Sequence, residues 1–194
     1  MKQENTVILR GSIVQRIFTQ KVAILRIKAV SILANTPEVM FFKNTDDIFD
    51  NYVVGDTVEI VGQICSYKKD EFNPSKKTHA IVGESIKSIP ENLVHDRNIN
   101  NQFQISGMIL DAMRICDNLV KFKVLTLKDN HFAVVPADYY TDTPDDLLSK
   151  FDKGQEVSIA GMVQTLSREK EGVVKHYENY VIKQITTEFS YGAA

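Results

Sequence analysis

A loop spanning residues 67–79 carries the residue types that bind nucleic acid strands. It holds four lysines, two aromatic residues and a histidine within thirteen positions. Lysine ammonium groups neutralise phosphates and release counterions, and aromatic rings offer bases a stacking surface that is indifferent to sequence. A solvated hairpin tip, in which lysine is also common, is the alternative interpretation. The candidate binding residues of this loop are Tyr67, Lys68, Lys69, Phe72, Lys76 and Lys77.

A second loop, residues 167–177, has mixed charge, because it also contains Glu169 and Glu171, which repel phosphate. Residues 1–97 hold 13 Lys+Arg against 12 Asp+Glu, whereas residues 98–194 hold 10 against 13. Net charge bears on binding partners. We therefore expect the first half to make the main nucleic-acid contact, and the second half to contribute less or to serve in assembly. The candidates in the second loop are Arg168, Lys170, Lys175 and Tyr177.

Cationic side chains also recur along two predicted strands. Arg26 and Lys28 share one strand face, as do Lys121 and Lys123, because residues two positions apart point the same way. Such pairs suit a groove that follows a phosphate backbone. They equally suit the solvent face of an amphipathic strand, or lysines that discourage edge pairing. Weaker candidates of the same set are Arg10, Arg16, Phe42 and Lys43.

Residues for catalysis or metal binding form no recognisable pattern. The histidines are scattered, without a cysteine or second histidine at ligand spacing. A glycine-rich phosphate loop and a nucleophile elbow are both missing from the sequence. Paired carboxylates such as Asp46 and Asp47 are explained by the positive end of a helix dipole. We therefore expect no enzymatic activity, no cofactor and no metal.

The composition indicates a cytoplasmic protein. Hydrophobic residues make up 43% of the chain, but no run approaches the ~18 apolar residues that a membrane-spanning helix needs. The first residues are polar, which is unlike a signal peptide. Cys65 and Cys116 are unrelated in position, which suits free thiols in a reducing compartment.

The elements that must position these residues occur twice. The segment 55–62, Gly-Asp-Thr-Val-Glu-Ile-Val-Gly, returns as Gly-Gln-Glu-Val-Ser-Ile-Ala-Gly at 154–161, and the acidic start of a helix precedes both copies. The two copies lie 99 positions apart, which is about the length of a small domain. A repeat at this spacing predicts two small domains. We place them at residues 1–92 and 101–189, with a short linker at 93–100.

Each half has the order of an OB-fold, a five-stranded barrel with a helix between its third and fourth strands. Short β-branched and aromatic runs bounded by polar residues predict the strands. Asn44 or Thr45 is expected to cap the first helix, and Thr143, followed by Pro144, the second. The fold class is thus all-β with short helices, in two tandem OB barrels. The strands are expected at residues 7–14, 22–30, 39–42, 57–67 and 78–89, and again at 103–110, 119–127, 132–136, 157–166 and 177–185.

Several of these strands resemble the bacterial single-stranded DNA-binding protein family. The resemblance lies in residues 58–69 and 78–86, in the opening strand 7–13, and in 157–165 and 177–182 of the second half. It implies sequence-independent binding of single-stranded DNA, or RNA, in replication, recombination or repair. Two units in one chain are similar to the family variant in which a homodimer supplies four OB-folds. An OB-type module that binds protein instead of nucleic acid is the alternative, since fold does not decide function.

The chain departs from that family in three ways. It contains no tryptophan, so Tyr67, Phe72, Phe42 and Tyr177 would have to stack on bases. It ends without the family's acidic C-terminal tail, so recruitment of other proteins through such a tail is not expected. Its net charge is −2. A weak or specialised binder, such as one from a mobile element, is therefore as consistent with the sequence as a main cellular protein.

Overall fold

The computed structural model describes residues 4–19, 21–29, 36–68, 77–94, 100–129, 131–170 and 173–187. Within these ranges, side chains are described except at 67, 68, 77, 78, 167–170 and 173–176. The elements are β1 (Asn5–Phe18), β2 (Ala23–Ala29), β3 (Glu38–Phe41), α1 (Thr45–Asn51), β4 (Thr57–Lys68), β5 (Lys77–Ser88), the 3-10 helix η1 (Glu91–Val94), β6 (Asn101–Cys116), β7 (Leu119–Lys128), β8 (His131–Tyr140), α2 (Pro144–Leu148), β9 (Glu156–Lys170) and β10 (Val173–Thr187).

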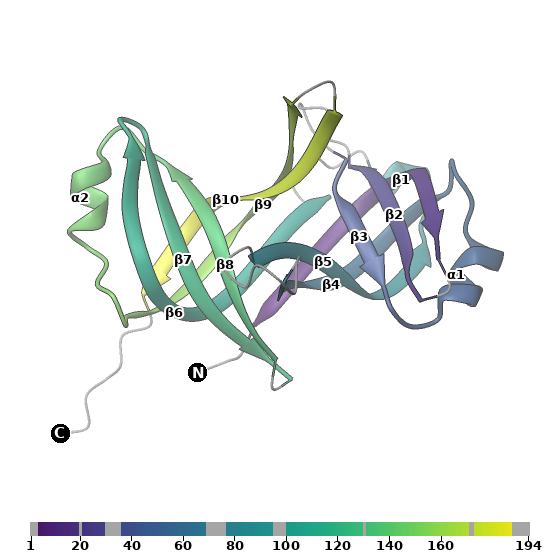
Figure 1. Ribbon diagram of the computed structural model, residues 1–194, viewed down its shortest axis with the longest axis horizontal. Helices are drawn as coiled ribbons and strands as arrows, with labels where there is room; N and C mark the ends of the chain where they lie inside the picture. Colours follow the sequence, from purple (N-terminus) through teal and green to yellow (C-terminus); the bar gives the residue numbers. More distant parts are fainter. Residues whose placement is uncertain are drawn as a thin grey trace.

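Each half of the chain closes into its own five-stranded barrel. In the first, the strands follow the order β1-β2-β3-β5-β4, and β1 pairs with both β2 and β4 to close the ring. The second repeats this as β6-β7-β8-β10-β9, with β6 pairing with both β7 and β9. The parallel pairs β3–β5 and β8–β10 occupy the same place in each. Two OB-folds are therefore confirmed, and Figure 1 shows them side by side with α1 and α2 at opposite ends.

Alternating side chains of β2 help to fill the first barrel. On β2, Ala23, Leu25, Ile27 and Ala29 are buried, while the residues between them face outward. This follows from the two-residue period of a strand, and burial of the apolar set drives closure. The shared face predicted for Arg26 and Lys28 is therefore the outward one.

A two-fold relation between the repeats joins the barrels. The first halves of β1 and β6 pair antiparallel, with Val7 opposite Phe103. These two residues occupy equivalent positions, because Val7 also pairs with Gly62 and Phe103 with Gly161. Self-complementary contact between equivalent patches is the geometry of a two-fold dimer. A single chain here contains both partners, and the ladder runs from one barrel into the other.

Two asparagines secure this junction in the same way. The side-chain amide of Asn5 donates to the carbonyl of Ile64 at 2.8 Å, and its oxygen accepts from the Ile64 N–H at 2.9 Å. Asn101 makes the equivalent pair of bonds with the backbone of Val163, at 2.5 and 3.0 Å. All four bonds are buried. They satisfy backbone groups that would otherwise be unpaired inside the protein.

Strand lengths and helix caps differ from the sequence predictions. The strands β1, β6, β8, β9 and β10 are longer than predicted. The first residues of β1 and β6 pair with each other, and their last residues pair with β2 and β7. Strand β8 runs from its hairpin to Tyr140, and β9 and β10 continue to pair as far as Lys170 and Val173. Asn44 precedes α1 in the left-handed region (φ 55°) and makes no side-chain cap bond, and neither does Thr143 before α2. The expected side-chain capping is therefore wrong, although both helices begin where predicted. The 3-10 helix η1 crosses the expected boundary between the first domain and the linker.

Candidate nucleic-acid interface

The outward face of β2 carries the predicted cations of the first barrel. Arg26 is partly held by its own barrel, because Nε lies 3.2 Å from Oε2 of Glu38 and Nη1 donates to Oε1 of Gln15 at 2.9 Å. Lys28 is exposed on the same face. These two positions therefore offer one accessible ammonium and one guanidinium that is shared with a carboxylate.

The matching face of the second barrel is neutralised more fully. Lys123 Nζ lies 3.1 Å from Oδ2 of Asp111, directly opposite it on β6. Lys121 bonds to Asp138, whose side chain is only 8% exposed. A lysine already paired with a carboxylate has less charge to offer a phosphate. The structure thus places all four strand cations outward, but three of them face an acidic neighbour.

Arg16 lies beside α1. Its guanidinium lies over the rings of Phe18 and Phe49, 4.9 and 5.1 Å from their centroids, and donates to the Phe49 carbonyl at 2.7 Å. Arg10, on the same strand, pairs with Glu59 at 2.5 Å. Lys87 also binds Glu59, and these hydrogen bonds lower the pKa of that carboxyl. Both arginines of β1 are therefore engaged within the first barrel.

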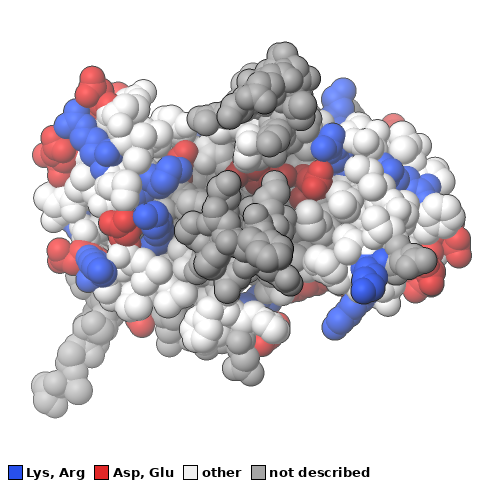
Figure 2. Space-filling view, viewed as in Figure 1, with Lys and Arg blue, Asp and Glu red and all other residues white. Residues whose placement is uncertain are grey.

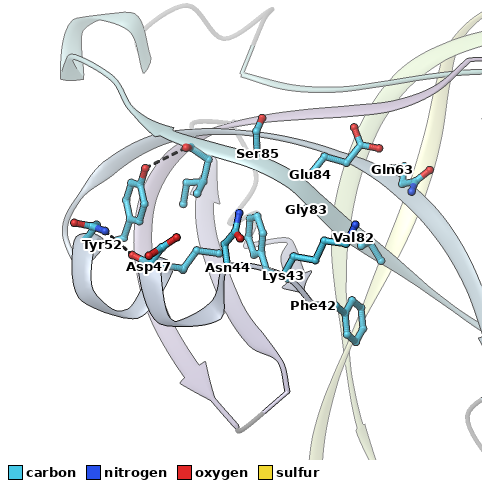
Figure 3. Close-up of a pocket in the computed structure, with 14 residues that line it drawn as sticks. Phe42, Lys43, Asn44, Asp47, Tyr52, Gln63, Val82, Gly83, Glu84 and Ser85 are labelled. Atoms are coloured by element: carbon cyan, nitrogen blue, oxygen red, sulfur yellow. Dashed lines mark hydrogen bonds between the residues drawn. The ribbon is translucent and has the colours of Figure 1, made fainter. Parts of the chain in front are cut away.

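A cleft of about 640 Å³ opens between the end of β3, α1 and β5 (Figure 3). Phe42 and Lys43 line it, and the Phe42 ring is 56% exposed. Gly83 lies on its floor, where a side chain would collide with the buried ring of Phe41. Across the cleft, Tyr52 Oη donates to the Ile86 carbonyl at 3.0 Å, which holds the end of α1 against β5. An exposed ring and a lysine thus meet at one edge of the barrel.

The same cleft also contains acidic groups. Asp47 on α1 and Glu84 on β5 both line it. Figure 2 likewise shows Lys and Arg interspersed with Asp and Glu among the described residues of both halves of the molecule. Binding of a nucleic acid strand at this cleft would depend on aromatic rings and a few cations more than on the electrostatic field of the whole protein.

Of the remaining predicted site residues, only Tyr177 has a described side chain. It is exposed on β10, beside Leu166 of β9. Lys69, Phe72 and Lys76 lie outside the described residues. The side chains of Tyr67, Lys68, Lys77, Arg168, Lys170 and Lys175 also lie outside the described part, although their backbones belong to β4, β5, β9 and β10.

The hairpin β9–β10 touches the first barrel at the partly buried carboxyl of Glu178. Oε1 of Glu178 accepts a hydrogen bond from the backbone N–H of Glu38 at 3.3 Å. Burial raises the pKa of Glu178, and this outweighs the opposing effect of the backbone N–H groups of Glu178 and Glu38, whose hydrogen bonds lower it. This contact joins β10 of the second unit to the start of β3 in the first unit. The Glu38 that takes part in it also pairs with Arg26, one of the outward cations of β2.

One exposed ring is not among the site residues predicted from the sequence. Phe132, at the start of β8, is 67% exposed and lies beside His131. Ala133 and Val135 are buried, so the alternation of the predicted strand 132–136 could have marked Phe132 as outward. Its nearness to the first barrel could not be read from that pattern.

The described part of the chain contains neither a candidate metal site nor a candidate membrane-spanning helix. Among those residues, no group of three or more His, Cys, Asp or Glu side chains could hold a metal ion. Neither described helix is long and apolar enough to cross a membrane.

Comparison with known proteins identifies the fold. No protein-family profile matches the chain, and no curated protein matches it. The solved structure of the wild-type single-stranded DNA binding protein from Thermus aquaticus matches with a TM-score of 0.69 at 13% identity, covering 100% of this chain and 97% of that one. A deletion mutant of the same protein matches with the same score and identity, covering 97% and 96%.

The chain shares the fold of that protein over its whole length. The likeness includes both barrels and their connection, because nearly all of each chain is covered. The resemblance expected from the strand patterns is thereby confirmed as a likeness of fold.

Proposed function

We propose that the protein binds single-stranded DNA, or RNA, without sequence preference, and acts by binding and not by catalysis. The observation that carries this proposal is the match along the whole chain to a protein described as single-stranded DNA binding. Exposed Phe42 and Tyr177, with Lys28 and Lys43, supply the ring and cation chemistry that such binding uses. The predicted loop residues, from Tyr67 to Lys77 and from Arg168 to Lys175, would complete the path.

The strand would contact the first unit more strongly than the second. The support is electrostatic, since Lys121 and Lys123 already face Asp138 and Asp111. We extend the proposal to a role in replication, recombination or repair in the cytoplasm. We also retain two domains, residues 1–92 and 101–189, joined by 93–100.

A homodimer with four barrels is the proposed assembly. The outer face of the joined β1–β6 ladder supports it, because a shallow cleft of about 500 Å³ there is lined by uncharged side chains such as Thr6, Ile8, Gln104 and Met162. Among the described residues, Glu4 and Lys183 alone bring charge to its lining. A surface poor in charge is typical of the core of an interface. Light scattering at micromolar concentration should give twice the mass of 22.0 kDa, and a monomer would contradict this assembly.

A titration with labelled oligonucleotides tests the function. An oligomer of about 30 nucleotides is long enough for several OB sites, and its affinity should fall steeply as salt rises. A duplex of the same sequence should bind more weakly, because its bases are not free to stack. Absence of any anisotropy change at low salt would reject this function. It would favour the module that binds protein, an alternative supported by the ion-paired cations of β2 and β7.

A further inference from the structure

A second cleft lies where the two barrels meet. Its volume is about 680 Å³, within the usual range of ligand pockets. Strands β2, β3, β4 and β5 of the first unit form most of its surface, and residues 131–133 of β8 in the second unit form one wall. Phe42, Gln63 and Val82 line both this cleft and the one beside α1, so the two clefts are neighbours.

The wall from the second unit is fixed in place by contacts with the first. The Ser66 hydroxyl on β4 donates to the Val134 carbonyl at 3.1 Å and accepts from the Val134 N–H at 3.0 Å. At the tip of the same β7–β8 hairpin, Lys128 Nζ lies 2.6 Å from Oε1 of Glu84 on β5. The backbone around Phe132 is therefore held against the first barrel by contacts both before and after it in the sequence.

The chemistry of the lining suits a nucleobase better than a phosphate. Ile24, Met40 and Val82 are apolar, Phe42 and Phe132 are exposed rings, and none of the lining residues in the described part of the chain is an Asp or Glu. Gln63 adds an amide, which can donate to and accept from base edges. A base has flat apolar faces and polar edges, so it matches such a surface. Stacking on a ring needs no particular sequence.

We propose that this cleft holds a base of the bound strand as it passes from the first unit to the second, with Phe132 as its stacking ring. The inference rests on the proposed function and adds a contact that composition did not reveal. Phe42 lies at the border of the two clefts and Lys43 lines the one beside α1, so a strand bound there would lie next to this cleft. The second unit thus contributes through an aromatic residue on β8, although its cations are largely neutralised.

The natural absence of tryptophan allows a direct test. In a Phe132→Trp variant, the single indole should be quenched when an oligomer of about 30 nucleotides binds. A Val54→Trp variant is the matched control, because Val54 is 59% exposed in the turn after α1 and does not line the cleft. Its emission should stay unchanged. Binding is followed separately by the anisotropy of the labelled oligomer.

Substitutions at the same position separate stacking from apolar contact. Phe132→Ala should weaken binding roughly 5- to 150-fold, the equivalent of 1–3 kcal/mol for one stacked base. Phe132→Leu should weaken it in the same direction, whereas Phe132→Tyr should retain the affinity. The salt slope should not change in any of them, because no phosphate contact is lost.

The two readouts distinguish the failure of each proposal. Oligomer binding without quenching at position 132, or wild-type affinity in Phe132→Leu, would overturn the cleft assignment while the proposed function stands. No change in anisotropy for the wild-type chain would reject the function itself, and the base site with it. Quenching at 132 together with weakened binding by Phe132→Ala would support both.

Discussion

Removing the carboxylate of Asp111 should strengthen binding to single-stranded DNA. This side chain lies opposite Lys123 on the neighbouring strand, with 3.1 Å between Oδ2 and Nζ, and both are 44% exposed. Asp111→Asn keeps the shape of the side chain but leaves Lys123 free to neutralise a phosphate. Because an exposed ion pair contributes only about 0–1 kcal/mol, the free energy of unfolding should change little.

The size of the effect follows from counterion release. One additional phosphate contact on a single strand steepens the dependence of log K on log salt by about 0.7. Over a fourfold rise in salt, the variant should therefore lose roughly 2.5-fold more affinity than the wild-type chain. At the low-salt end it should bind several-fold more tightly. Anisotropy titrations at four or more salt concentrations would measure both quantities.

Asp117→Asn is the control for net charge. It removes the same single charge from the second unit, and its partner Arg114, 2.8 Å away, keeps a second carboxylate, Asp145, at 2.9 Å. Its salt slope should match that of the wild-type chain. If the two variants behave alike, only overall charge matters. If Asp111→Asn leaves the slope unchanged, Lys123 lies off the path of the strand, and the assignment of this strand face is wrong.

Three further predictions concern the loops, the junction and pH. Replacing the four lysines of residues 68–77 with alanine should weaken binding and flatten the salt slope more than replacing Arg168, Lys170 and Lys175, as measured in the same titrations. Asn5→Ala should lower the free energy of unfolding in urea by about 2–6 kcal/mol, since it leaves two buried backbone groups of Ile64 unpaired at about 1–3 kcal/mol each. A negligible loss would mean that water or a shifted strand satisfies them. The raised pKa of Glu178 means that its contribution to stability is present below the ordinary value of 4.5 and is lost as pH rises through the higher folded value. Glu178→Gln should remove that loss in urea titrations across pH, and an unchanged pH profile would show that another group controls it.

Local periodicity determined much of the architecture. The alternation of Ala23, Leu25 and Ile27 specified which face of β2 enters the core, because successive side chains on a strand point to opposite sides. The repeated segments 55–62 and 154–161 indicated two similar units. Helix starts were also readable, since acidic residues and Pro144 mark them. Both barrels could therefore be predicted before any tertiary contact was known.

Other features depended on which strands meet and in what register. Lys123 was predicted to face outward, but its neutralisation by Asp111 appears only when β6 and β7 pair. Strand β1 was predicted too short because its first residues pair with β6, far along the chain, and its last residues pair with β2. Phe42 and Phe132 line one cleft only because the β7–β8 hairpin rests on β4. A sequence period reports the face on which a side chain lies, whereas barrel closure and the two-fold junction decide what that face meets.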